Sequence, residues 1–198
     1  MPFWSETFGE ERSLKDPKRN FRFMVEFQGI QAAQGGASLW YAKKVSKPSF
    51  TVAAAEHQYL NHKFYYPGAL TWNDVSVTLV DPVDPDVTAT LSDIIQQSGY
   101  SPPSDATAQS MNSMSKAKAA GSLGTVVIMQ LDSNGKSLEE WTLWNAWISD
   151  VKFGDGLEYG NDDLTTVDVT LKYDWARVIT PQGKSAAVMS GGNEFFKV

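Results

Sequence analysis

Period-two alternation of apolar and polar side chains is the feature that most restricts how this sequence can fold. It is cleanest in residues 166–175, and it recurs in residues 21–28 and 74–79. Alternation of this kind is typical of β-strands that bury one face. One-sided strands must bury their apolar faces against one another. The sequence therefore predicts a mainly β protein, an antiparallel barrel or sandwich of about seven strands with one short α-helix.

Turn and capping residues divide the chain between the strands. Asn134-Gly135 predicts a tight hairpin turn after residues 126–131. The expected helix lies in residues 88–99, with Asp86 or Thr88 as its N-cap and Gly99 at its end. Three further segments are expected to be less regular: residues 53–61 as a loop, residues 62–82 as two strands joined at Pro67-Gly68, and residues 101–123 as a loop with a weak helical turn.

Three tryptophans, Trp141, Trp144 and Trp147, stand within one short stretch. On a single strand Trp141 and Trp147 share one face and Trp144 lies on the other. Both faces are then apolar, which predicts cover from a second layer or from a neighbouring chain. A helix that groups Trp144 with Ile148 and Val151 is the alternative.

The charge balance limits the possible partners. The chain of 198 residues has a formal net charge of −6 and a pI of about 4.9. Tight binding to a phosphate backbone depends on clustered lysine and arginine, so this balance argues against it. The sequence has no cysteine, no apolar run of membrane-spanning length and no signal-peptide pattern at its start.

No residue set predicts catalysis. His57 and His62, the two histidines, point to opposite faces of a strand, and the chain has no Gly-x-Ser-x-Gly stretch. The acidic loop with Asp155, Glu158, Asp162 and Asp163 does not have the spacing of a twelve-residue calcium loop, and a solvated turn is favoured. We therefore expect no enzyme activity, no metal and no cofactor. The aromatic content leaves a monomeric, tryptophan-rich carbohydrate-binding β-sandwich as an alternative.

Four stretches together resemble one family. In order along the chain they are "KVSKPSF", "NHKFYYPGALTWNDVSVTLVDP", "GKSLEEWTLWNAWI" and "DDLTTVDVTLKYDW". They are similar to the tail tube proteins of contractile-tailed bacteriophages, whose relatives include tube proteins of pyocins, contractile injection systems and type VI secretion. The resemblance covers about residues 20–175, as a diffuse pattern without a catalytic motif.

The resemblance implies a structural, non-enzymatic subunit. Six copies would form a ring, and stacked rings would form a hollow tail tube inside a contractile sheath, alongside tape-measure and baseplate proteins. In a phage virion, assembled in the host cytoplasm, the tube would conduct DNA into the host without binding it specifically. A pyocin or injection-system tube, through which no DNA passes, is the alternative within the family.

The resemblance also suggests roles for three groups of residues. The polar face of residues 166–174 is the candidate lumen lining, namely Thr166, Asp168, Thr170, Lys172 and Asp174. The three tryptophans are candidate contacts within a ring. The candidate contacts between rings are Phe3, Trp4, Tyr59, Leu60, Phe195 and Phe196.

The expected organisation is an N-terminal arm, residues 1–20, a tail-tube barrel domain, residues 21–175, and a C-terminal extension, residues 176–198. Many family members stop soon after the last aromatic strand, so the extension departs from the family pattern. The roles of the extension and of the loop 101–120 are left open.

Overall fold

The computed structural model describes residues 17–29, 38–39, 42–84, 86–102, 113–154, 156–160, 162–180 and 194–195. Within these ranges the chain is mostly antiparallel β, which confirms the predicted fold class. Four of the expected contact residues, Phe3, Trp4, Phe195 and Phe196, have no described side chain.

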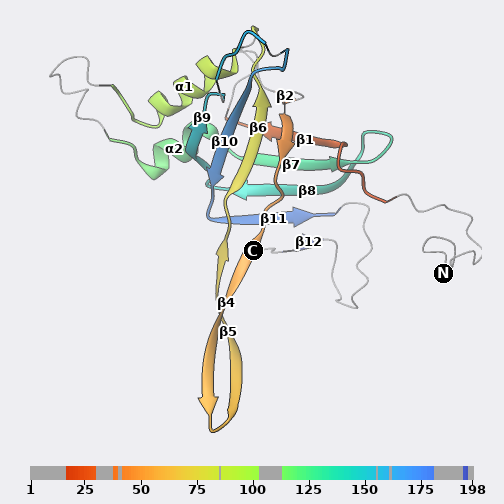
Figure 1. Cartoon of the computed structure of the whole chain (residues 1–198), viewed down its shortest axis with the longest axis vertical. Helices are drawn as coiled ribbons and strands as arrows, with labels where there is room; N and C mark the ends of the chain where they lie inside the picture. Colours follow the sequence, from red (N-terminus) through yellow and green to blue (C-terminus); the bar gives the residue numbers. More distant parts are fainter. Residues whose placement is uncertain are drawn as a thin grey trace, which may run out of the picture.

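Two sheets form the body of the molecule. The first, in the order β12-β11-β8-β7-β1-β2, consists of Glu194–Phe195, Trp175–Ile179, Ser137–Trp144, Val126–Leu131, Phe23–Phe27 and Ser38–Leu39. The second, in the order β3-β6-β10-β9, consists of Ala42–Val45, Val75–Val80, Thr166–Lys172 and Trp147–Lys152. In Figure 1 the strands of the two sheets run across one another.

The core lies between the sheets and is built from the alternating residues. In the first sheet Val25, Val126 and Leu143 are 0% exposed. In the second sheet Val77 is 0% exposed and Val169 is 1% exposed. The burial pattern of β10 follows the predicted alternation, so the side chains that the sequence placed inward are the buried ones.

Two helices pack beside the sheets, where the sequence predicted one. The expected helix is α1, Val87–Gln97; Asp86 caps it by accepting a hydrogen bond from the Ala89 N–H. The second helix is α2, Lys116–Leu123, capped by Ser115. The expectation of only a weak helical turn in this segment was wrong, because Ala119 and Leu123 bury one side of the segment against the body. Tertiary packing stabilises a short helix that its own sequence would not.

A long hairpin replaces the expected loop at residues 53–61. It consists of β4, Phe50–Tyr59, and β5, His62–Trp72, and it projects away from the body (Figure 1). Pro67 does not divide it, because a two-stranded ribbon has an open edge on which a missing N–H costs no ladder bond. The register shifts between Val52 and Ala54, opposite Gly68, and this irregularity accommodates the Pro-Gly pair.

The tryptophan segment is broken at Asn145, which has a φ of 52°. Trp141 therefore lies in β8 of the first sheet and Trp147 in β9 of the second, so the prediction that they share one face of a single strand was wrong. The run 166–175 is broken in the same way, between β10 and β11. The two breaks are joined, because the Asn145 side-chain amide donates to Asp174 at 2.8 Å and the Asp174 N–H donates to the Trp144 carbonyl at 3.0 Å.

Candidate assembly surfaces

The β4–β5 hairpin exposes many large apolar side chains. Every residue of β4 is exposed, as is every residue of β5 except Trp72. Tyr59, Leu60 and Tyr65 are 63%, 76% and 64% exposed. An isolated two-stranded ribbon is marginally stable in water, and an apolar patch of this kind marks a contact surface.

Strand pairing divides the outer half of the hairpin into two unlike faces. On one face, which we call the aromatic face, the paired residues are Ala55 with Tyr66, His57 with Phe64, and Tyr59 with His62. The prediction that the two histidines point to opposite faces was therefore wrong, because they lie on two paired strands and not on one. The opposite face carries Tyr65 and an ion pair between Lys63 and Glu56 at 2.8 Å. Because the aromatic face has no carboxylate or lysine, it is the side better suited to burial against another protein.

The tip of the hairpin carries an unfavourable residue. Leu60 has a φ of 52°, a conformation that costs a branched residue roughly 1–2 kcal/mol and that glycine or asparagine adopts readily. Its side chain is 76% exposed, so packing inside this chain does not explain the choice of leucine. A residue type that its backbone conformation disfavours, without compensating packing in its own chain, is typical of a functional position.

The base of the hairpin is fixed to the body by aromatic contacts. The ring centroids of Phe50 and Trp72 lie 5.3 Å apart, and those of Trp72 and Tyr173 lie 5.9 Å apart. Trp72 and Tyr173 also pack against the hydrophobic core. The hairpin thus has an anchored base and an unpartnered outer half.

The predicted lumen residues divide between two places. Thr166, Asp168, Thr170 and Lys172 alternate on the outward side of β10, with Asp168 and Lys172 exposed. Asp168 accepts a hydrogen bond from the Thr78 hydroxyl at 2.6 Å. Asp174 lies beyond the end of β10, in the link to β11, where hydrogen bonds from Lys116 and Asn145 lower the pKa of its carboxyl. The first four residues therefore form one polar surface, and Asp174 has a separate structural partner set.

The three tryptophans occupy three different environments. Trp141 packs against the core from β8, and Trp147 is half-buried in β9. Trp144 is 42% exposed and stacks on Trp175, which is 41% exposed, with ring centroids 6.3 Å apart. Of the predicted ring contacts, Trp144 offers the most open surface, and sequence reasoning did not identify Trp175 as its partner.

A charged cluster that the sequence did not predict connects three segments at one end of the core. Glu139 in β8 accepts from Lys18 and, at 2.7 Å, from Lys47, and the Trp141 indole N–H also donates to it. Burial raises the pKa of the Glu139 carboxyl, but the three hydrogen bonds outweigh burial and lower this pKa to about 2. The two lysines are far from Glu139 in the sequence, so no local pattern reveals the cluster.

The described part of the chain contains neither a candidate metal site nor a candidate membrane-spanning helix. Within the described ranges, no group of three histidine, aspartate or glutamate side chains is placed to hold a metal ion. Neither of the two helices that the structure describes has the length and apolar character of a membrane span.

Comparison with known proteins finds the same fold in solved structures. One match is a chain of the anti-feeding prophage tube-terminating cap, with a TM-score of 0.61 and 12% identity over 88% of this chain and 99% of that one. A chain of the anti-feeding prophage baseplate, six-fold symmetrised, gives a TM-score of 0.58 at 16% identity over 85% of this chain and 99% of that one.

A third match is a chain of the PVC sheath-tube complex, an extracellular contractile injection system in the extended state. Its TM-score is 0.56 at 15% identity, over 84% of this chain and 94% of that one. No family model and no curated protein matches the sequence. The chain therefore has the β fold of chains found in contractile injection-system particles, with little sequence identity to them.

Proposed function

We propose that this protein is a structural, non-enzymatic subunit of the inner tube of a contractile particle. The observation that carries the proposal is the projecting hairpin, whose exposed aromatic face has no partner within the described chain. The fold is shared with chains of tube-cap, baseplate and sheath-tube structures, and the baseplate structure is six-fold symmetrised. A stacked tube of six-membered rings gives such a hairpin a partner at every level.

The proposed contacts follow from this arrangement. Tyr59 and Leu60 at the hairpin tip reach the adjacent ring, together with the arm residues Phe3 and Trp4 and the tail residues Phe195 and Phe196. Trp141, Trp144 and Trp147 are the proposed contacts within the ring, and Trp144, stacked on Trp175, is the most exposed of the three. The tube then contacts a sheath outside it, and baseplate and tape-measure proteins at assembly.

The polar face of β10 is the proposed lumen wall. Its hydroxyls and charged groups, Thr166, Asp168, Thr170 and Lys172, favour hydration over adhesion. Together with the net charge of −6, such a wall repels phosphate groups and lets DNA slide in a phage tail. The matched particles include named injection systems, so a tube that carries cargo other than DNA is the second candidate.

Self-association that depends on the aromatic face tests the proposal. The double substitution Tyr59→Ser with Phe64→Ser removes two exposed rings from that face, and Tyr65→Ser removes one from the opposite face of the same hairpin. We expect the wild type and Tyr65→Ser to form six-subunit species and larger assemblies of the 21.8-kDa chain in sedimentation velocity. The double variant should stay folded and stop at the six-subunit species, because the aromatic face is the proposed contact with the adjacent ring. A wild type that stays monomeric and binds sugars on a glycan array would instead support the carbohydrate-binding alternative.

A further inference from the structure

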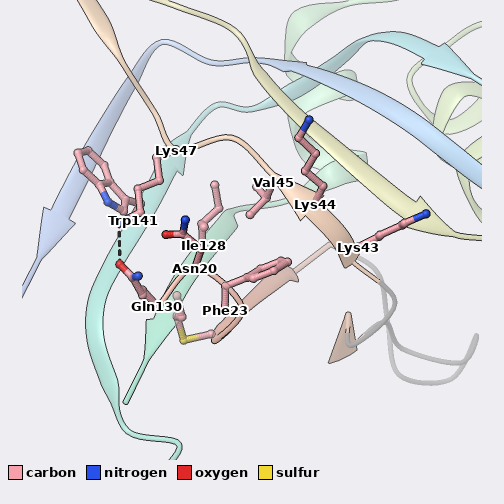
Figure 2. A pocket seen from close by; sticks show the side chains of 10 residues that line it. Asn20, Phe23, Lys43, Lys44, Val45, Lys47, Ile128, Gln130 and Trp141 are labelled. Atoms are coloured by element: carbon pink, nitrogen blue, oxygen red, sulfur yellow. Dashed lines mark hydrogen bonds between the residues drawn. The ribbon is translucent and has the colours of Figure 1, made fainter. Parts of the chain in front are cut away.

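A pocket opens at the end of the core beside the Glu139 cluster. It has a volume of about 390 Å³ and lies where the inner face of the first sheet meets β3 of the second (Figure 2). Its apolar lining includes Phe23, Val45, Ile128 and Trp141. A dry cavity of about 150 Å³ is enough to bind benzene, so this pocket has room for more than one aromatic side chain.

The rim of the pocket is basic, although the protein as a whole is acidic. Lys43, Lys44 and Lys47 all line it. Lys43 is the extra residue of a β-bulge, because Ala42 pairs with Leu79 and Lys44 pairs with Thr78. Strand alternation alone would send two successive lysines to opposite faces, and the bulge brings both to one rim. Lys47 bonds Gln130 and Glu139, whereas Lys43 and Lys44 have no ion-pair partner within the described ranges.

The chemistry of the pocket defines its occupant as a segment with aromatic side chains and carboxylates. Residues 3–11, "FWSETFGEE", contain Phe3, Trp4 and Phe8 with three glutamates and no basic residue. The other segments outside the described ranges do not combine several acids with several aromatics; residues 181–193 and 196–198, for example, contain two lysines and no acid.

The chain reaches the pocket directly from this segment. The described part begins at Pro17, Lys18 is paired with Glu139, and Asn20 itself lines the pocket. Five residues lie between Glu11 and Pro17, and the six steps from one Cα to the next allow a reach of roughly 20 Å in extended chain. Tethering so close to the rim gives residues 3–11 a high effective concentration at the pocket.

We propose that the pocket is the docking site of the chain's own residues 3–11, with aromatic rings in the apolar lining and glutamates on Lys43 and Lys44. Filling the pocket extends the core by burying the half-buried rings of Phe23 and Trp141. Docking also neutralises two lysines that lie beside the polar face of the second sheet. This inference concerns the free subunit, in which Phe3 and Trp4 are not engaged with an adjacent ring.

Zero-length carbodiimide cross-linking of the full chain tests the proposal, because it joins only a carboxylate and an amine in direct contact. The reaction is run below the assembly concentration on a mixture of unlabelled and heavy-nitrogen protein, so that links within one chain are distinguished from links between copies. We expect Glu6, Glu10 and Glu11 to link to Lys43 and Lys44 within one chain, several-fold more often than to the exposed controls Lys118 and Lys172. The ion pair of Lys116 and Asp174, at 2.6 Å, gives an internal link that reports an intact fold.

A triple variant, Phe3→Ser with Trp4→Ser and Phe8→Ser, separates docking from charge attraction alone. It keeps every glutamate, and the links to Lys43 and Lys44 should fall to the level of the control lysines, while Tyr59→Ser leaves them unchanged. Uniform linking to all lysines, or links that persist in the triple variant, would overturn the docking. Links found mainly between labelled and unlabelled chains would show that a second copy fills the pocket, which also contradicts the proposal.

Discussion

At the scale of single residues, Glu139 is the clearest case of a side chain whose environment determines its chemistry. Its side chain is 11% exposed, while Lys18 and Lys47 remain 47% and 49% exposed. The carboxylate is therefore partly withdrawn from water but held by two solvated cations and an indole. The cluster ties the start of the described chain and the segment before the hairpin to β8.

Glu139→Gln should reduce the free energy of unfolding at neutral pH by about 1–2 kcal/mol, since the lysines are partly screened by solvent. The folded-state pKa of about 2 lies below the ordinary 4.5, so the stabilisation by this carboxylate is complete above about pH 4.5. It is lost as the pH falls towards 2. Urea unfolding of both proteins at pH 7 and at pH 3 measures the difference.

The control for this prediction is Glu140→Gln, one residue further along β8 and on the opposite face. It should change the free energy of unfolding by no more than about 0.5 kcal/mol. Equal effects of the two substitutions at pH 7, or a Glu139→Gln effect that grows as the pH falls, would contradict the account of the cluster.

At the scale of elements, the base and the outer half of the hairpin have different environments. Its base packs on the core through Trp72, while its outer half adds apolar surface that nothing in the described chain covers. Substitutions in the outer half should therefore alter contacts between copies and leave the fold of the subunit intact.

Leu60→Gly is the sharpest test at the hairpin. Glycine removes the strain of the positive φ at the tip, but it also increases the conformational entropy of the unfolded chain. Because these two effects oppose each other, the free energy of unfolding should stay within about 1 kcal/mol of the wild-type value. Assembly should fall sharply if the leucine side chain enters a neighbouring subunit, as measured by light scattering at matched concentrations. Unchanged assembly with Leu60→Gly would remove the tip from the proposed ring contact.

Several elements of the fold could be predicted from the sequence, and others could not. The alternation of β1, β6 and β10, the α1 cap at Asp86 and the turn at Asn134-Gly135 all follow from local chemistry and agree with the structure. The breaks at Asn145 and Asp174 could not be predicted from local chemistry. A run of alternating residues has the same pattern whether it stays in one sheet or crosses to another. Asparagine tolerates a positive φ, which was the available signal at Asn145.

The candidate surfaces were predicted less completely than the fold. The sequence analysis predicts Tyr59 and Leu60 as contact residues but places them in a loop, whereas they lie at the tip of a hairpin. The run "KFYY" carries the exposed Phe64, Tyr65 and Tyr66. The sequence predicts only a strand here, because it does not show which strand lacks a second layer. The Glu139 cluster joins residues that are distant in the sequence, and only the fold brings them together.

At the scale of the whole molecule, the central feature is the surface that would face the interior of a tube. The polar face of β10 is the proposed wall, and Asp168 is its exposed acid. Asp168→Lys reverses the charge at every copy in the tube and removes the hydrogen bond from Thr78. A wall with added lysines attracts phosphate groups, and the attraction weakens with salt.

Tubes of Asp168→Lys should therefore assemble normally and retain DNA in a salt-dependent manner, and phage particles that carry it should deliver DNA poorly. Asp93→Lys makes the same charge change on the exposed side of α1 and should do neither. Retention measured by filter binding that is equal for the two variants would exclude the face of β10 as the lumen wall.

The central claim is that this chain builds a hollow tube, and negative-stain electron microscopy of the concentrated full-length protein tests it most directly. The account predicts six-fold rings or stacked hollow tubes for the wild type, grown from a baseplate where the pure protein needs a nucleus. The Tyr59→Ser and Phe64→Ser variant should give rings but no stacked tubes. A wild type that remains a monodisperse monomer both alone and with a baseplate would contradict the account.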